Sequence, residues 1–358
     1  MKKILVFGYN MDIGGAEKSL LDTLNYLTNK YEIDLYLLEK KGDLLNDLDK
    51  SINIFELKKN LIFYIFFRYI SLFRKIVINS IANSKDYDFA VGYIEGRSAT
   101  WVSDIKKKIK KIAWIHCDVS KFDIGISYYE AKKSYNNMDY IICVSNEAKN
   151  NFCNKYSISK GKVSVINNFI DENLVKEKSL EFNVHNNVFT FLNVAKMRKE
   201  KRQDRLIKAA AMLKRKGYKF KIQLIGDGPN LEFITKMMYD NDVDDVVEIL
   251  GVKKNPYPYI KNCDYFILPS SSEGYGIVIK EALTLGKKII TTNTVGPKEI
   301  LQNGKLGIIV SNTDSAVINV MEEVLKNKDK YNYLDNILLK YEGDNEEIKK
   351  KILKLFGE

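Results

Sequence analysis

The chain has 358 residues, of which 45% are hydrophobic and 29% are charged, and its formal net charge at pH 7 is +11. This length is long for one domain and sufficient for two domains with a core each. Four cysteines without a C-x-x-C pair and only two histidines argue against a disulfide scaffold and a metal centre, and they favour a reducing, cytoplasmic setting. No stretch reaches the roughly 20 apolar residues of a transmembrane helix, and the N-terminus reads as a strand rather than a signal peptide.

The first half of the chain alternates predicted strands with helical patterns. A strand over residues 2–7 leads into a turn with Gly14 and Gly15, and an amphipathic helix then runs to about Leu27. Further strands are predicted over residues 33–38, 88–92, 111–115, 140–144 and 163–166. This alternation is typical of a parallel α/β domain. The first turn does not read G-x-G-x-x-G, so a two-domain NAD(P)-dependent dehydrogenase loses its main support.

Residues 57–77 combine aromatic and basic side chains. They include five Lys and Arg residues and no acidic residue, and residues 51–111 as a whole hold 12 Lys and Arg against 5 Asp and Glu. A helix of this composition can lie in the interface of an anionic membrane, and the basic run over residues 106–111 adds to the same face. A core helix with a solvated basic edge explains the pattern equally well. Nucleic acid fits less well, because the apolar residues form one continuous block.

Polar residues follow two of the predicted strands in this half. His116 and Asp118 come directly after the strand over residues 111–115, so we expect His116 at the edge of the sheet where ligands bind. A single histidine is more often a structural residue than a ligand-binding one. Ser145 follows the next strand and is expected to cap the helix after it.

From residue 171 to residue 187 the chain becomes polar and charged, as a linker would, and a second α/β unit follows. Its strands are predicted over residues 189–194, 220–225, 247–250, 265–269, 288–292 and 307–310. The first strand leads into a basic loop with Lys196 and Lys201, and the third leads into Gly251 and Val252. An amphipathic helix is predicted over residues 344–356.

Residues 265–285 are the most informative stretch of the chain. A strand is followed by a turn with Glu273 and Gly276 and then by a helix that carries Glu281. Glycine permits turn conformations that other residues resist, and the free amides at the start of such a helix favour an anion. Carboxylates in the turn and in the helix can then bind hydroxyl groups around a phosphate. Two glutamates taken alone are more often solvated surface residues.

The string S-E-G-Y-G-x-x-x-x-E-A, with its E-x7-E spacing, resembles the nucleotide-sugar motif of retaining glycosyltransferases of the GT-B fold, family 4. The G-G-A-E turn that begins at Gly14, the W-I-H-x-D segment around His116 and the link over residues 166–171 resemble the same family. The loop over residues 195–202 departs from the family's G-R-L-x-x-x-K-G pattern. Lys196 replaces the arginine. This replacement keeps the positive charge but loses the bidentate hydrogen bonding of a guanidinium group, whereas Lys201 matches the family's lysine.

This resemblance implies an α/β protein of the GT-B fold, in which two Rossmann-like parallel α/β domains face each other across a cleft and the C-terminal helix crosses back to the N-terminal domain. Residues 1–170 with 344–358 would bind the acceptor, and residues 171–343 the nucleotide sugar, with neither a cofactor nor a metal. The catalytic residues would be His116, Glu273, Lys196 and Lys201. The residues that bind the donor nucleotide would be Gly14, Gly15, Gly251, Val252, Tyr275, Gly276, Ile277 and Glu281. Asp118 would meet the acceptor or orient the imidazole of His116.

The expected function is the retaining transfer of a sugar from a nucleotide-diphosphate sugar, UDP-sugar before GDP-sugar, to an acceptor hydroxyl. The basic, aromatic segment favours a lipid-linked or surface-polysaccharide acceptor and a place on the inner face of the plasma membrane. Two alternatives remain open. One is a GT-B sugar-nucleotide epimerase, for which His116 and His185 are the only histidines. The other is a non-catalytic protein of the same fold that binds a nucleotide or a membrane surface.

Overall fold

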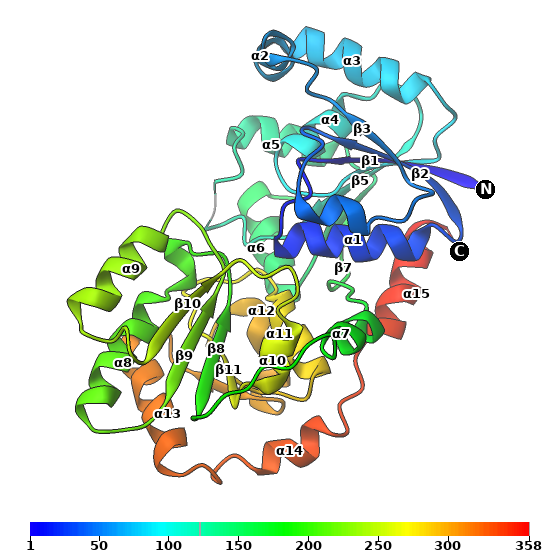
Figure 1. The fold of residues 1–358 in the computed structure, drawn as a ribbon. Coiled ribbons are helices and arrows are strands. Elements are labelled where there is room, and N and C mark those ends of the chain that lie inside the picture. The colour runs from blue at the N-terminus through cyan, green and yellow to red at the C-terminus, as the bar shows by residue number, and fades with distance from the viewer. Residues whose placement is uncertain (122, 358) are drawn as a thin grey trace. The chain divides into compact units, whose positions relative to one another are not determined.

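A computed structural model describes residues 1–121 and 123–357, and these residues form two compact units. The N-terminal unit contains Met1–Phe169 and the C-terminal residues from Asn345 onward, and the C-terminal unit contains Ile170–Asp344. Each unit is a parallel sheet with helices packed on it (Figure 1). The predicted fold class, two parallel α/β domains with the C-terminal helix returned to the first of them, is confirmed.

The sheet of the N-terminal unit has seven parallel strands in the order β3-β2-β1-β4-β5-β6-β7. Their bounds are β1 Lys2–Gly8, β2 Tyr31–Leu37, β3 Asn53–Glu56, β4 Phe89–Gly92, β5 Lys110–Ile115, β6 Tyr140–Cys143 and β7 Val163–Val165. β3 is the only one of these strands that the sequence analysis did not predict. It is a four-residue edge strand with mostly exposed side chains, so it lacks the apolar run that marks the others.

Seven helices and two short 3₁₀ turns accompany this sheet in the described residues. They are α1 Gly15–Leu27, η1 Asp43–Asp47, α2 Leu61–Tyr69, α3 Ser71–Asn83, α4 Arg97–Asp104, α5 Tyr128–Asn136, α6 Asn146–Tyr156, η2 Lys160–Lys162 and α15 Asn345–Leu355, with α7 belonging to the other unit. α15 is held by aromatic contacts of Phe356 with Tyr31 and Phe89, whose ring centroids lie 5.6 and 5.1 Å from its own. The C-terminal helix is therefore part of the core of the N-terminal unit.

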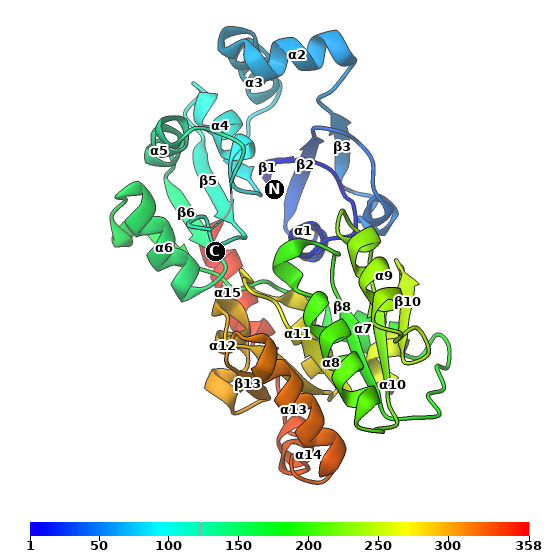
Figure 2. The same ribbon diagram turned by 90° about the vertical axis from the view of Figure 1, so that its left-hand side faces the viewer.

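The basic, aromatic segment forms two helices rather than the single helix that was predicted. The side chain of Asn60 accepts a hydrogen bond from the amide of Phe63 at 2.8 Å and so caps α2. The chain leaves helical geometry at Ile70 (φ −102°, ψ 98°), and α3 begins at the next residue. α2 and α3 lie beside each other at the outer edge of the unit, near α4 (Figure 2).

One side of this segment packs into the core and the other side carries exposed apolar residues, and its binding to a membrane stays a prediction. Phe67 and Arg74 are buried, and the ring of Phe67 packs 5.6 Å from that of Trp101. Large apolar side chains on the remaining surface are 43–71% exposed: Leu61, Ile62, Ile65, Phe66, Tyr69, Ile70, Leu72 and Ile76. Within the described residues no helix has both the length and the apolar character needed to cross a bilayer.

The sheet of the C-terminal unit has six parallel strands in the order β10-β9-β8-β11-β12-β13. Their bounds are β8 Thr190–Val194, β9 Lys221–Ile225, β10 Val247–Gly251, β11 Tyr265–Leu268, β12 Lys288–Thr292 and β13 Ile308–Val310. The helical elements are α7 Glu172–Lys178, η3 Lys199–Lys201, α8 Asp204–Arg215, α9 Leu231–Asp240, α10 Tyr257–Asn262, α11 Ile277–Thr284, α12 Val295–Ile300, η4 Gln302–Gly304, α13 Asp314–Lys326 and α14 Tyr333–Leu338.

Two apolar clusters hold this second unit together, one on each face of the sheet. Side chains of α8, α9 and α13 pack on one face, and side chains of α10, α11 and α14 pack on the other. The central strands are buried on both sides, as expected of a doubly wound parallel sheet. α11 therefore lies with its apolar side against the sheet, which fixes where its first turn and Glu281 are placed.

Candidate functional site

The turn before α11 requires a glycine at position 276. Gly276 has φ 84° and ψ 55°, a left-handed conformation that other residues rarely adopt. A Cβ atom there would also lie 3.2 Å from Cγ of Glu273. Among the described residues no side chain caps the first amides of α11, so these amides remain available to an anion.

A second glycine brings α12 against the same turn. A Cβ atom on Gly296 would lie 2.2 Å from Cα of Tyr275, so the two backbones touch. The side chain of Tyr275 points into the protein, and burial raises the pKa of its hydroxyl well above the usual value. Tyr275, Gly276 and Ile277 therefore offer a ligand mainly backbone groups.

The structure brings together two of the predicted catalytic residues. The amine of Lys201 donates to Oε2 of Glu273 at 2.5 Å, and both side chains are partly exposed, at 21% and 11%. The hydroxyl of Ser270 lies 3.4 Å from the same oxygen. The loop of Lys201 is held in place by the amide of Ser271, which donates to the carbonyl of Glu200 at 2.8 Å. A cation and a carboxylate thus stand side by side at the turn before α11.

Lys196 stands at the carboxyl end of the neighbouring strand β8. Its side chain is half-buried, and no carboxylate of residues 1–121 or 123–357 lies within ion-pair distance of its amine. Arg202, in the same loop, adopts φ 53°, a left-handed conformation that residues other than glycine rarely adopt. Its guanidinium bonds Asp204 at 2.8 Å and Asp314 at 2.9 Å. Lys196 therefore has no counter-charge among the described residues, whereas Arg202 anchors the loop.

Glu281 is 4% exposed, which overturns the reading of a solvated glutamate. The hydroxyl of Tyr257, at the start of α10, donates to its Oε1 at 3.1 Å. The sequence analysis missed Tyr257, because nothing in the sequence links residues that lie 24 positions apart. The neighbouring Lys280 was also missed: it is 1% exposed, pairs with Asp344 at 2.6 Å, and burial lowers its pKa. α11 thus carries two buried charged residues in succession.

Gly251 is the last residue of β10, one residue later than the strand end that was predicted, and Val252 follows the strand. Gly251 has φ 67°, and its carbonyl accepts the amide of Gly226 at 2.9 Å, which ties the loop after β10 to the loop after β9. Val252 is 50% exposed. The two residues are placed at the carboxyl end of the sheet, and their role in binding a nucleobase stays a prediction.

His116 lies at the end of β5, stacked among aromatic rings. Its ring centroid is 4.8 Å from that of Tyr93 and 6.4 Å from that of Trp114. The residue as a whole is half-buried, but both ring nitrogens are shielded from solvent, and the polar groups that face the ring are the side chain of Asn168 and the backbone of Tyr93. Burial lowers the pKa of the imidazole to about 3. His116 is therefore neutral at pH 7, with polar atoms that a ligand can satisfy.

Asp118 does not orient this imidazole, which corrects one of the two roles expected of it. Its carboxylate accepts hydrogen bonds from the hydroxyl of Ser120 at 2.6 Å and from the side-chain amide of Asn151 at 3.0 Å. Burial alone would raise the pKa of Asp118, but these hydrogen bonds outweigh it and the pKa is lowered. Asp118 holds the loop after β5 to α6, and Ser145 caps α6 as predicted.

Gly14 and Gly15 form the start of α1. Gly14 is the residue before the helix and has an extended backbone (φ −166°, ψ 160°) that any residue can adopt. In the described residues α1, like α11, lacks a side-chain cap. The feature of this turn that suits an anion is therefore its uncapped amides. No strained glycine is involved.

Comparisons with known proteins cover both units. The family model described as Glycosyltransferase Family 4 matches residues 13–174, and the one described as Glycosyl transferases group 1 matches residues 175–338. The chain is 25% identical over 333 residues, 87% of it and 86% of the relative, to an N-acetylgalactosaminyltransferase of Campylobacter jejuni. The full name of that enzyme gives N-acetylgalactosamine-N,N'-diacetylbacillosaminyl-diphospho-undecaprenol as the molecule it acts on.

Two solved structures share the fold. HepE of Anabaena in complex with UDP and glucose superposes with a TM-score of 0.80 at 17% identity and covers 99% of both chains. Sucrose-phosphate synthase of Thermosynechococcus elongatus superposes with a TM-score of 0.81 at 15% identity and covers 99% of this chain and 98% of that one.

Proposed function

We propose, on the premise that this chain belongs to the group 1, family 4 glycosyltransferases of the GT-B fold, that it transfers a sugar with retention from a nucleotide-diphosphate sugar to an acceptor hydroxyl. The observation that carries this proposal is the grouping in the C-terminal unit of uncapped helix amides, the Lys201–Glu273 pair and the buried Glu281 around one turn. Such a turn suits a ligand that combines a diphosphate with hydroxyl groups.

The chemical task is to stabilise the negative charge that grows on the departing diphosphate while the anomeric bond loosens. Lys201, Lys196 and the first amides of α11 are groups suited to that charge, and they need little rearrangement because the loops that carry them are fixed. In this scheme no residue of the enzyme attacks the sugar. A leaving phosphate oxygen assists deprotonation of the acceptor, which then attacks from the same face.

The two glutamates are proposed to bind hydroxyl groups. By the resemblance, Glu281 binds the ribose and Glu273 a hydroxyl of the transferred sugar. Glu273 also fixes Lys201 through their 2.5 Å contact, so one carboxylate both orders the cation and faces the sugar. His116 is proposed to hydrogen-bond a sugar hydroxyl. Its neutral imidazole suits that role and does not suit acid or base chemistry near pH 7.

We favour UDP as the nucleotide, because the neighbour HepE was solved with UDP and glucose. A thermal-unfolding screen against UDP-, GDP- and ADP-sugars tests this choice, since stabilisation by a ligand rises with its affinity. Product analysis then separates the alternatives: released nucleotide with a glycosylated acceptor supports a transferase, an isomerised sugar supports an epimerase, and stabilisation without turnover supports a binding protein.

Glu281→Ala tests the assigned site directly. We expect the loss of the hydroxyl acceptor to lower kcat/KM by about 100-fold or more, because hydrogen bonds to a charged group contribute about 1.5–3 kcal/mol each. Glu232→Ala, at an exposed residue of α9, is the matched control. Full activity of the folded Glu281 variant would refute the assignment.

The acceptor is proposed to be a lipid-linked or surface-polysaccharide glycan, reached at an anionic membrane surface. The relative from Campylobacter jejuni, whose name contains a diphospho-undecaprenol, supports the lipid-linked form. The exposed apolar side chains of α2 and α3, with the basic residues Lys58, Lys59 and Lys75 beside them, are suited to the headgroup region.

Sedimentation with phosphatidylglycerol vesicles tests the membrane proposal. The variant Ile62→Ser/Phe66→Ser/Leu72→Ser removes exposed side chains only, whereas changes at Phe67 or Arg74 would disturb the core. We expect this variant to lose vesicle binding. The control replaces three exposed apolar residues of the C-terminal unit, Met212, Phe233 and Leu339, with serine. Equal binding by the wild type and both variants would rule the proposal out.

A further inference from the structure

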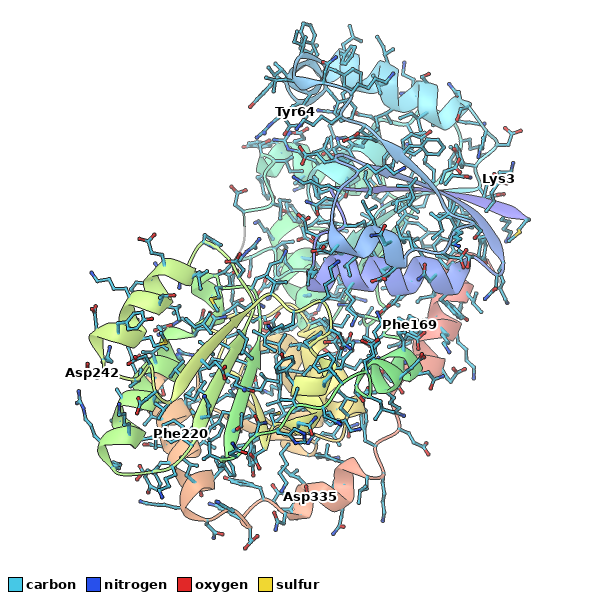
Figure 3. All side chains as sticks on the ribbon, viewed as in Figure 1. Lys3, Tyr64, Phe169, Phe220, Asp242 and Asp335 are labelled. Carbon is cyan, nitrogen blue, oxygen red and sulfur yellow. The ribbon has the colours of Figure 1, made fainter. Side chains whose placement is uncertain are left out.

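An open pocket in the N-terminal unit has a lining rich in arginine and aromatic residues. It is a shallow depression between α2, α3, α4 and α5 that opens to solvent. The side chains that matter for its chemistry are Tyr64, Arg68, Arg74, Arg97, Trp101 and Glu130. Tyr64, labelled in Figure 3, belongs to α2 and so connects this pocket to the exposed apolar helix pair.

The three arginines differ in how their charge is balanced. Arg74 is neutralised, because its Nε donates to Asp104 at 2.8 Å and its guanidinium lies 3.6 Å from Glu130. Arg68 donates to the hydroxyl of Tyr64 at 2.9 Å, and its Nε is buried without a hydrogen-bond partner among the described residues. No carboxylate in the described part of the chain pairs with Arg68 or Arg97. The pocket thus holds two guanidinium groups without a counter-charge.

The pocket lies where a parallel α/β sheet binds ligands. Arg97 is the first residue of α4, which follows the carboxyl end of β4, and Leu38 of the lining follows the carboxyl end of β2. In doubly wound folds ligands bind beyond this edge of the sheet. The same edge carries α2, whose outer side chains Leu61, Ile62 and Tyr69 are 67–71% exposed. An anion site and an apolar surface are therefore adjacent.

We propose that Arg68 and Arg97 bind a phosphate group of the acceptor, and that this acceptor is a lipid-linked phosphate or diphosphate. The inference rests on the proposed function, since it assumes an acceptor used by this enzyme. Planar guanidinium groups bind phosphate oxygens in a bidentate manner. Bound phosphate would also give the buried Nε of Arg68 the acceptor that it lacks. Arg74, fixed by Asp104 and Glu130, forms part of the wall.

Calorimetric titration of the full-length protein with farnesyl diphosphate tests this inference. We expect Arg68→Gln/Arg97→Gln to weaken binding by about 10-fold or more, because hydrogen bonds to charged groups are lost. Lys59→Gln/Lys75→Gln removes the same amount of charge from residues outside the pocket lining and should change the affinity by about twofold or less. Arg97→Gln alone leaves α2 unchanged and serves if the double variant does not fold.

Two further probes separate the sources of phosphate. Inorganic pyrophosphate should bind more weakly than farnesyl diphosphate, and equal affinity would overturn the lipid-linked part of the inference. Phosphatidylglycerol vesicles should bind the Arg68/Arg97 variant as well as they bind the wild type, and the Lys59/Lys75 variant more weakly, because Lys59 and Lys75 flank the exposed apolar side chains. A loss confined to the arginine variant, without farnesyl diphosphate binding by the wild type, would assign the site to a phospholipid headgroup and overturn the inference.

The nucleotide sugar provides the check on the underlying function. Thermal stabilisation by the best nucleotide sugar should be the same in the wild type and in the Arg68/Arg97 variant, because most of the proposed donor residues lie in the other unit and none of them lines this pocket. Stabilisation by the nucleotide sugar without any farnesyl diphosphate binding would refute the phosphate site and leave the transferase proposal standing. Absence of both would refute both.

Discussion

The two α/β units hold their candidate residues in opposite electrostatic states. In the C-terminal unit, Lys201 and Glu273 are charged, paired at 2.5 Å and partly exposed. In the N-terminal unit, His116 is neutral and enclosed by aromatic rings, and its ring nitrogens are shielded from solvent. The same strand, turn and helix arrangement thus supports two kinds of chemistry: charges that meet a diphosphate, and an uncharged polar group that suits a hydroxyl.

Within the described part of the chain, the helices at the two candidate sites leave their first amides without a side-chain cap, a feature that other helices such as α4 share. α1 and α11 both start after a glycine and, in the residues described, without a side-chain cap. α6 and α13 are capped by the hydroxyls of Ser145 and Thr313 at 3.2 Å. A cap would occupy the amides that an anion needs. The first amides of α1 and α11 are therefore open to an anion, whereas one amide of α6 and one of α13 are already bonded to a cap.

The largest effect on activity should come from the charged pair of Lys201 and Glu273. Lys201→Met removes the cation beside the proposed diphosphate, and we expect kcat to fall by roughly 10²–10³-fold, the usual effect of losing one well-placed group that stabilises developing charge. Steady-state kinetics with the best nucleotide sugar measures it. Lys199→Met, at an exposed residue of the same short helix, is the control and should leave kcat close to the wild-type value. A similar loss in both variants would remove the special role of Lys201.

The neutral state of the His116 imidazole should be detectable as a pH effect on the stability of the protein. The folded-state pKa of His116 is lowered to about 3, below its unfolded value, so the unfolded chain takes up a proton first as the pH falls. Stability from this residue is therefore fully present above about pH 6.5 and decreases as the pH falls from there toward 3, by up to about 1.4 kcal/mol per pH unit.

Replacing His116 with asparagine should remove this contribution. Between pH 7 and pH 5, the free energy of unfolding of the variant should fall by about 1–2 kcal/mol less than that of the wild type. Urea unfolding curves at both pH values give the difference. His185→Asn, at an exposed residue of the C-terminal unit, is the control. Parallel pH profiles of the wild type and the His116 variant would contradict the neutral, enclosed imidazole.

The sequence predicted the fold better than it predicted the contacts within the sites. Buried strands such as β1 and β11 were placed to within a residue or so, because their apolar runs are continuous. The exposed edge strand β3 has no such run, and the break at Ile70 between α2 and α3 is not marked by a proline or a glycine. Local polarity patterns alone do not reveal either of them.

Within the sites, the sequence identified residue types and positions but not partners. The hydrogen bond from Ser120 to Asp118 spans two residues and is a local turn, so it was open to prediction from the sequence. The contacts of Lys201 with Glu273 and of Tyr257 with Glu281 join residues 72 and 24 positions apart. Such partners depend on how strands are ordered in the sheet, which no single motif encodes.

The smallest effect should come from the residue that the sequence analysis missed. Tyr257→Phe removes only the hydroxyl that donates to Glu281 at 3.1 Å, so the carboxylate stays but loses one orienting bond. A hydrogen bond to a charged group contributes about 1.5–3 kcal/mol, part of which water can replace, so we expect the dissociation constant of UDP to rise roughly 5- to 10-fold.

A comparison of UDP with 2′-deoxy-UDP shows whether this effect acts through Glu281. If Tyr257 orients the carboxylate toward the ribose, the wild type should prefer UDP, and Tyr257→Phe should reduce that preference. Tyr259→Phe, on the same helix but packed against Phe182, should preserve it. An equal loss of affinity for both nucleotides in the Tyr257 variant would mean that the hydroxyl stabilises the fold of α10 and α11 without positioning Glu281 for the ribose.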